Sequence, residues 1–218
     1  MIHVVIDLEM NPIRQELKEV RSLMPEEVIE IGAVKLDDKF AQLDTFQCYV
    51  KPEYGSITRH ITKLTGITDE TVADKDTFAA AFDNFLKWLG TDDFTIYSWS
   101  NSDINQLKYE CAYKLQNFDM TRFDANWVDL QREFDDRIGL QGNLSLNYAV
   151  GAINKNFKGT QHTALADAIN TAAILTLMQD EEKFRETMQP VIDLINPRRM
   201  SASIGELYPE LSNLRFDE

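Results

Sequence analysis

A chain of 218 residues, 44% of them hydrophobic, is large enough for one α/β domain with a substantial core. Its 36 acidic and 22 basic side chains give a net charge of -14, which argues against a surface that attracts nucleic acid or anionic lipid as a whole. No apolar run reaches the roughly 20 residues that span a bilayer, and the N-terminus lacks the pattern of a signal peptide. We therefore expect a cytoplasmic protein with no membrane partner.

The cysteines and histidines limit the metal sites that the chain can form. Cys48 and Cys111 form no CxxC pair, so neither a disulfide framework nor a thiolate zinc site is indicated. The three histidines include no HExxH arrangement, which excludes that class of zinc peptidase. Hard cations with oxygen ligands are the metals that remain.

The first quarter of the chain predicts an antiparallel sheet. A short apolar strand is expected at residues 2–8, and the Asn-Pro pair that follows suits a helix N-cap and first helical position. Helical spacing then predicts an inserted helix at about residues 12–24, ended by a proline. Residues 28–36 and 45–51 are rich in β-formers, with a turn signal between them. These three strands should form an antiparallel meander.

The rest of the chain alternates helices with strands. A small helix is expected at about residues 57–64, closed by Gly66, and an apolar stripe predicts a helix at 78–89. A fourth strand is expected at 94–98, and further helices at 102–115, 128–138, 144–154 and 163–178. This alternation favours parallel pairing. We expect an α/β fold in which antiparallel strands one to three are followed by parallel strands, with helices flanking a central mixed sheet.

Two acidic side chains end the first strand. Asp7 and Glu9 are two residues apart, so their carboxylates point to the same face of the strand. Like charges so close repel each other unless a cation lies between them. An isolated Asp-x-Glu is more often a strand end that reaches solvent, so this motif gains meaning only from others.

A third acidic side chain follows the fourth strand. Asp103 stands at a predicted helix start with Gln106 three residues later, which by itself favours a capping box. If the first and fourth strands are neighbours, however, Asp103 lies at the same edge of the sheet as Asp7. The two interpretations make different predictions about what the carboxylate contacts.

The last signal is a histidine followed by an aspartate. His162 and Asp167 are five residues apart, which on one helix separates their directions by about 140°. They converge only if His162 lies in a loop before the helix, and Gly159 and Thr160 favour such a loop. Taken singly, a surface histidine and a first-turn acid stabilised by the helix dipole explain the pair equally well.

Together these signals follow one order along the chain: Asp7-x-Glu9, Asp103 and His162-x-x-x-x-Asp167. In this order they resemble the three motifs of the DEDDh (DnaQ-like) 3'-5' exonucleases of the ribonuclease H-like superfamily. Three further stretches resemble the Eri-type and KapD branch of that family: residues 28–34, 64–68 and 162–168. The resemblance implies a ribonuclease H-like fold, with an exonuclease domain at residues 1–180. It does not cover residues 181–218, where the sequence pattern predicts a C-terminal helix and a polar extension.

The resemblance also implies roles for the five side chains. Two Mg²⁺ or Mn²⁺ ions would be bound, with Asp7 bridging both. Glu9 and Asp167 would hold the ion that activates a water molecule, and Asp103 would support the second ion. His162 would accept a proton from the attacking water, a role that suits an imidazole titrating near neutrality.

The implied substrate is the 3' end of single-stranded RNA or DNA, from which nucleoside monophosphates would be released. Met10 stands where the family often has threonine, so we expect it to contact the terminal nucleotide, with a gap-filling core methionine as the equal alternative. The acidic surface predicts short substrates or substrates delivered by a partner protein, whose identity the sequence leaves open. The choice between RNA and DNA is also open, because it depends on a 2'-hydroxyl contact.

Two other functions were weighed. Asp7-x-Glu9 partly resembles the DxD motif of aspartyl-phosphate phosphatases, but that chemistry needs a second aspartate and a following threonine or valine where Glu9 and Asn11 stand. A non-catalytic regulatory or binding module on an exonuclease scaffold would be supported by the loss of one of the five polar residues. All five are present, which favours an enzyme.

Overall fold

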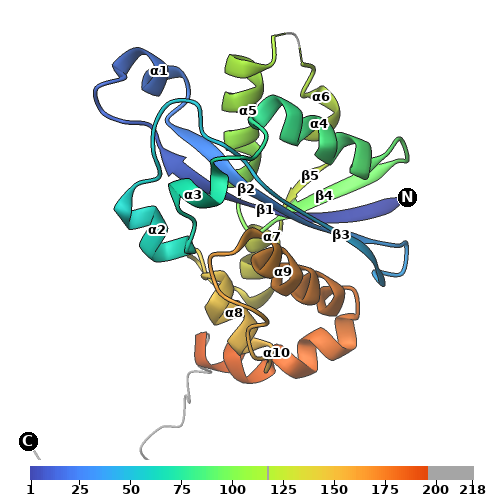
Figure 1. Ribbon diagram of the computed structural model, residues 1–218. Helices are drawn as coiled ribbons and strands as arrows, with labels where there is room; N and C mark the ends of the chain where they lie inside the picture. Colours follow the sequence, from blue (N-terminus) through green and yellow to red (C-terminus); the bar gives the residue numbers. More distant parts are fainter. Residues whose placement is uncertain (117, 196–218) are drawn as a thin grey trace, which may run out of the picture.

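A mixed five-stranded sheet forms the centre of the computed structural model, which describes residues 1–116 and 118–195 (Figure 1). The strand order is β3-β2-β1-β4-β5. The strands span Ile2–Pro12 (β1), Glu26–Leu36 (β2), Gln42–Tyr49 (β3), Phe94–Ser98 (β4) and Trp127–Asp129 (β5). β1 pairs antiparallel with β2 and parallel with β4. On the outer sides, β3 pairs antiparallel with β2, and β5 pairs parallel with β4. The predicted mixed sheet is confirmed.

Ten helices are present in the described residues. They span Lys18–Leu23 (α1), Arg59–Thr65 (α2), Asp69–Val72 (α3), Phe78–Leu89 (α4), Ser102–Lys114 (α5), Thr121–Ala125 (α6), Leu130–Ile138 (α7), Leu146–Ala152 (α8), Ala164–Met178 (α9) and Glu181–Ile195 (α10). None of these helices is both long and apolar enough to cross a membrane.

The helices cover the two faces of the sheet in separate groups. Alternate residues of β1 point to opposite faces, so Val4 and Ile6 join a core with α4, α5 and α6, whereas Val5 joins a second core with α7, α8, α9 and α10. Figure 1 shows these two groups on either side of the strands. Apart from His3, the central strand is therefore apolar on both faces until it reaches Asp7.

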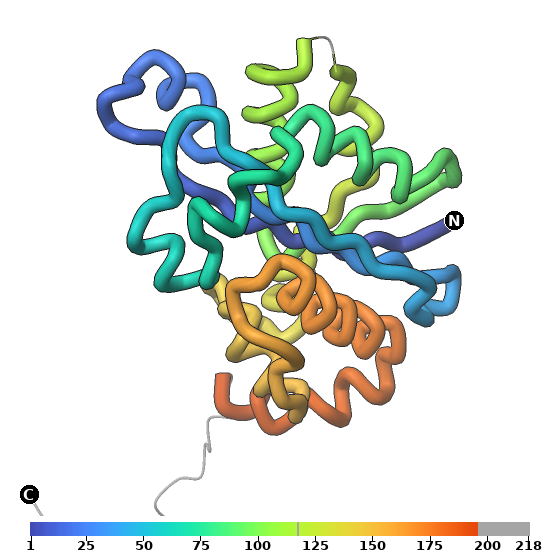
Figure 2. Tube along the Cα trace, viewed as in Figure 1, coloured from blue at the N-terminus to red at the C-terminus, as the bar shows by residue number. Residues whose placement is uncertain are grey.

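The predicted inserted helix at residues 12–24 is wrong in its extent. β1 continues as far as Pro12, which pairs with Glu26, and only Lys18–Leu23 form a helix. Asn11 is not an N-cap, because its side chain accepts a hydrogen bond from the Thr58 amide (2.9 Å) and donates one to the Ser56 carbonyl (3.2 Å). In Figure 2 this excursion between β1 and β2, in blue, projects from the end of the sheet.

The predicted helix at residues 128–138 is also too long. Its first residues form β5, in which Trp127 pairs with Ile96 of β4, and α7 begins only at Leu130. The Asp129 side chain caps α7 by accepting from the Arg132 amide at 3.0 Å. The short helices α3 and α6 were not predicted either.

Other boundaries agree with the sequence. Gly66 ends α2 with a left-handed φ of 78°, as a C-cap glycine does, and α4 and β4 have the predicted bounds. α10 packs on the face of α7 and α9 through Phe184 and Met188, which are buried in the same core. The predicted extension at residues 196–218 lies outside the described residues, and the domain boundary at 180 stays a prediction.

Candidate active site

The strand β1 carries the first two site residues at its carboxyl end. Asp7 pairs with Gly32 of β2, and Glu9 pairs with Glu30. Asp7 and Glu9 are two and four residues after Val5, so all three side chains point to the same face of the sheet, which α9 covers. A β-bulge between Glu9 and the next residue ends the regular pairing at this point. The predicted convergence of the two carboxylates on one face is confirmed.

Asp103 joins them from the first turn of α5. Its Oδ1 accepts a hydrogen bond from the backbone amide of Leu8 at 3.0 Å, and the side chain is only 5% exposed. The capping box favoured for Asp103 alone is therefore wrong: Gln106 instead donates to the Glu26 carbonyl at 2.8 Å. Because β4 is the parallel neighbour of β1, the helix that follows β4 places Asp103 beside the acids of β1.

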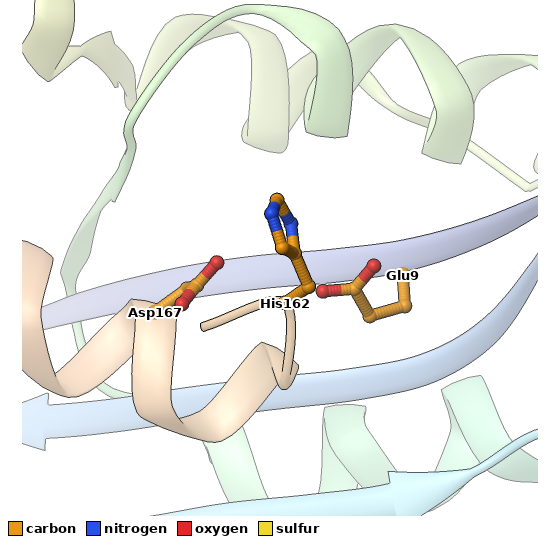
Figure 3. A group of neighbouring side chains, drawn as sticks. All are labelled: Glu9, His162 and Asp167. Carbon is orange, nitrogen blue, oxygen red and sulfur yellow. The ribbon is translucent and has the colours of Figure 1, made fainter. Parts of the chain in front are cut away.

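His162 and Asp167 come from the loop before α9 and its first turn. α9 begins at Ala164, so His162 lies in the preceding loop, as predicted, with a left-handed φ of 61°. One ligand atom each from Glu9, His162 and Asp167 lies within 4.8 Å of the others. Figure 3 shows the imidazole standing between the two carboxylates. Residues that are more than 150 positions apart in the chain thus meet at one point.

The four acids line a cleft of about 330 Å³. Its other walls are largely apolar and come from the β1 end, α2, the β4–α5 connection and α8: Leu8, Met10, Ile61, Leu64, Trp99 and Leu146. A second pocket of about 230 Å³ adjoins it and contains His162. Asp167 and Leu146 line both pockets, so the histidine and the acid cluster face connected spaces.

Met10 combines the two roles predicted as alternatives for it, and Trp99 likewise belongs both to the core and to the cleft wall. Met10 is half-buried, packs against the core between the sheet and α4, and lines the cleft. Trp99 is buried against Phe134, and its ring nitrogen donates to the Leu144 carbonyl at 3.0 Å, while one side of it reaches the cleft. The contact of Met10 with a terminal nucleotide stays a prediction.

Burial and mutual repulsion raise the pKa of Asp7, Glu9, Asp103 and Asp167. Burial is the main cause in each case, and it raises the pKa of Glu9 to about 8 and that of Asp103 and Asp167 to about 7. The pKa of Asp7 is also well above its usual range, because burial is reinforced by the charges of the three other acids. At neutral pH, ionisation of all four carboxyl groups is unfavourable, because burial and their mutual repulsion disfavour the charged forms. A bound cation would offset this repulsion.

The donor set fits a hard divalent cation. Asp167 Oδ1 is buried and has no hydrogen-bond partner among the residues that the structure describes, and the Asp167 carboxylate lies beside Glu9 and His162. An unpartnered buried carboxylate oxygen is costly, and a cation satisfies it. Carboxylate oxygens are the ligands that Mg²⁺ and Mn²⁺ prefer. The arrangement can therefore hold divalent metal close to a histidine.

One site neighbour was missed by the sequence reasoning. Glu30 of β2 lies opposite Glu9 in the sheet, is 1% exposed, and accepts hydrogen bonds from the Ala164 amide (3.1 Å) and the Gln47 side chain (2.6 Å). A signal was available, because a glutamate inside an apolar strand run needs buried partners. The sequence could not say which partners these are.

Comparison with protein families gives a match over most of the chain. The family model described as an exonuclease, RNase_T, matches residues 4–175. The probable 3'-5' exonuclease KapD of Bacillus subtilis is 28% identical over 170 residues, covering 75% of this chain and 78% of that protein. The 3'-5' exoribonuclease 1 of Rattus norvegicus is 25% identical over 167 residues, covering 71% of this chain. The chain spans 47% of the length of this mammalian relative.

A solved structure shows the same fold. The nuclease domain of 3'hExo, a DEDDh family member solved with rAMP bound, superposes with a TM-score of 0.71 at 23% sequence identity. The match covers 83% of this chain and 92% of that domain. The predicted ribonuclease H-like fold is confirmed by this similarity.

Proposed function

The chain belongs to the RNase_T exonuclease family, as the motifs predicted, and we propose that it removes nucleoside monophosphates from the 3' end of single-stranded RNA or DNA. The observation that carries the proposal is the convergence of four carboxylates in one cleft at the carboxyl end of β1, with a histidine from the adjoining pocket beside Glu9 and Asp167. The family membership supports the hydrolytic class, and the chemistry of these five side chains supports the mechanism.

The four carboxylates would hold two Mg²⁺ or Mn²⁺ ions: Asp7, Glu9, Asp103 and Asp167. Bound divalent cations supply an activated water, neutralise the charge of the phosphate, and stabilise the leaving oxygen. The protein's own part is to fix the ligands, and here each comes from an ordered element. Asp7 and Glu9 lie on the central strand, the Leu8 amide fixes Asp103, and Asp167 lies in the first turn of α9.

We assign to His162 the role of general base. Its imidazole would accept the proton of the attacking water, which fits a side chain that lies beside Glu9 and Asp167 and is itself exposed. A side-chain hydrogen bond of the neighbouring residue fixes the loop that carries His162. Gln161 donates to the Asn147 side chain of α8 at 2.9 Å, so the loop is linked across the second pocket.

The shape of the cleft supports a single unpaired nucleotide at a strand end. Apolar side chains such as Met10, Leu64 and Leu146 suit the flat face of a base, and the acid cluster lies beside them. We propose that Met10 contacts this terminal nucleotide. The net charge of -14 provides little attraction for phosphates away from the cleft, so we expect short oligonucleotides or strands presented by a protein partner.

Degradation of labelled oligonucleotides tests the proposal. Purified protein is incubated with 5'-labelled single strands of RNA and DNA, from two nucleotides upward, in Mg²⁺, in Mn²⁺ and in EDTA. We expect metal-dependent ladders that shorten from the 3' end, and the two nucleic acids side by side decide the preference. Absence of shortening for every substrate in both metals would contradict catalysis and favour a non-catalytic binding module.

A matched pair of variants ties activity to the cleft. Asp7→Asn should abolish the ladders while the circular dichroism spectrum is unchanged, because the amide replaces a carboxylate at the centre of the ligand set. Asp93→Asn makes the same chemical change at an exposed position and should keep full activity. Full activity of Asp7→Asn would show that the site is assigned wrongly or that the nuclease is a contaminant.

A further inference from the structure

The site is assembled from two halves that do not share a secondary-structure element. One half, Asp7 and Glu9, lies on the central strand, and the other, His162 and Asp167, belongs to α9 and the loop before it. Such halves keep a fixed separation only if something joins the strand to the start of α9. Glu30 of β2 lies where such a connection is needed, because it is the residue opposite Glu9 in the antiparallel pair.

Glu30 caps α9 from the neighbouring strand. The first backbone amides of a helix have no partner within the helix, and Thr163 at the N-cap makes no side-chain hydrogen bond to them within the described chain. Instead Glu30 Oε2 accepts from the amide of Ala164, the first residue of α9, at 3.1 Å. A negative charge at this end also interacts favourably with the helix dipole.

Gln47 fixes the other oxygen of the same carboxylate. Its side-chain nitrogen donates to Glu30 Oε1 at 2.6 Å, and Gln47 lies on β3, the next strand outward. Both oxygens of Glu30 are thus engaged by donors of the protein, and the side chain is 1% exposed. These contacts distinguish Glu30 from the cleft acids, and they orient its carboxylate toward α9.

Gly32 lets the helix rest directly on the strand beside this contact. A Cβ atom at position 32 would lie 2.1 Å from the backbone nitrogen of Leu165 and 2.2 Å from the carbonyl carbon of Ala164. Gly32 is two residues from Glu30 and pairs with Asp7. The start of α9 therefore contacts β2 through backbone at position 32 and through a side-chain hydrogen bond at position 30.

We propose that Glu30 is a positioning residue that sets His162 and Asp167 in register with Asp7 and Glu9. This inference rests on the proposed function and adds to it a residue outside the ligand set. Glu30 acts through its two hydrogen bonds: it holds the Ala164 amide, and Gln47 holds Glu30. If Glu30 no longer makes these hydrogen bonds, α9 should shift relative to β1, and the two halves of the site should move apart.

Two substitutions at position 30 separate hydrogen bonding from charge. Glu30→Met keeps an unbranched side chain of similar length but removes both oxygens, so the Ala164 amide loses its acceptor. Glu30→Gln keeps one oxygen for the Ala164 amide, and the Gln47 amide can turn over to accept from the new NH2 group. Glu30→Gln therefore preserves both hydrogen bonds and removes only the negative charge.

The kinetic expectation is a loss in kcat in Glu30→Met that Glu30→Gln largely avoids. Supporting residues of metal sites typically contribute about 10- to 100-fold, and we expect Glu30→Met to lower kcat by this amount with KM for a short oligonucleotide little changed. Glu30→Gln should keep most of kcat. Wild-type kcat in Glu30→Met would overturn the proposal, as would a folded Glu30→Gln that is as slow as Glu30→Met.

Two measurements on the full chain decide the matter without activity. Hydrogen exchange at the amides of residues 164–167 should be faster in Glu30→Met and stay near the wild-type rate in Glu30→Gln. Calorimetric titration with Mn²⁺ should show about 10-fold weaker binding in Glu30→Met and nearly wild-type binding in Glu30→Gln. Unchanged exchange and Mn²⁺ affinity in Glu30→Met would overturn the positioning role. If the wild-type protein has no nuclease activity, the proposed function fails, and these two readouts still test Glu30.

Discussion

The crowding of acids in the cleft predicts that the metal-free protein becomes less stable as the pH rises. The folded-state pKa values of Glu9, Asp103 and Asp167 are about 8, 7 and 7, above those of the unfolded chain. Between the unfolded and folded values the folded state binds more protons, so the free energy of unfolding decreases with increasing pH. In EDTA we therefore expect Tm to fall steadily from pH 5 to pH 8.

Asp103→Asn isolates one contribution to this effect. A carboxyl group with a pKa of about 7 in place of its ordinary 3.8 is disfavoured as an anion by about 4 kcal/mol, since one pKa unit corresponds to about 1.4 kcal/mol. Asparagine keeps the oxygen that accepts from Leu8, although a neutral hydrogen bond is weaker by about 1 kcal/mol. Repulsion among the remaining acids persists. We therefore expect a net stabilisation of about 3 kcal/mol at pH 8.

The assay is thermal unfolding in EDTA and in Mg²⁺ or Mn²⁺ at pH 5 and pH 8. For a chain of 218 residues, about 3 kcal/mol raises Tm by about 6–12 °C. The gain of Asp103→Asn should shrink toward zero at pH 5, where the wild-type carboxyl is already protonated in the folded state. Divalent metal should stabilise the wild type more at pH 8 than at pH 5, because cations and protons compete for the same oxygens.

An exposed acid provides the control for the charge change itself. Asp93→Asn removes one negative charge outside the cleft and should leave Tm nearly unchanged at both pH values. A wild-type Tm that is flat or rises from pH 5 to pH 8 in EDTA would refute the reasoning. So would a gain for Asp103→Asn that is equal at the two pH values.

Three further substitutions test how the site is supported. Gly32→Ala should destabilise the fold by at least about 2 kcal/mol in urea unfolding and lower activity, because its Cβ would lie 2.1 Å from the Leu165 nitrogen. Lys114→Met should lower the free energy of unfolding by about 3–5 kcal/mol, since it leaves two buried carboxylates without their cation. Gln161→Ala should lower kcat about fivefold in the oligonucleotide assay with Tm little changed, because the loop that carries His162 loses its tie to α8.

Each of these has a matched control in the same chain. Gly142→Ala adds a Cβ where no atom lies within 4 Å, so its stability and activity should stay near the wild type. Lys87→Met removes an exposed pair with Asp83 and should cost less than about 1 kcal/mol. Asn147→Ala should reproduce the kinetic effect of Gln161→Ala, and the two effects should not add in the double variant. Additive effects would contradict the assigned contact.

Several features of the site follow from short stretches of sequence. The alternation of apolar and acidic residues in β1 was enough to place Asp7 and Glu9 on one face, because strand geometry repeats every two residues. The five-residue spacing of His162 and Asp167 required the histidine to lie before the helix, and the structure places it there. Gly66 ended a helix as glycine usually does. In each case the determining interaction lies within a few residues of the signal.

Local signals failed where a distant segment offered a better partner. The Asn-Pro pair after β1 suggested a helix start, but Asn11 bonds to the loop at residues 56–58 and β1 continues along β2. Asp103 suggested a capping box, but its carboxylate takes the amide of Leu8, 95 residues away in the chain. β5 was assigned to a helix because its three residues gain their pairing only from β4. A short stretch of sequence does not reveal these partners, because they lie far away in the chain.

The sequence by itself determined the family of this protein and the order of its main elements, and it predicted the five side chains that converge at the candidate site. Periodicity and motif spacing reflect interactions between residues that are close in the chain, so they can be recognised in a single sequence. The tertiary structure alone decided how the site is held together: Asp103 is bonded to the central strand, and Glu30 bridges β2 to the start of α9. Both contacts join a buried carboxylate to a backbone amide from a remote segment, and only folding creates the burial that makes such a bond necessary.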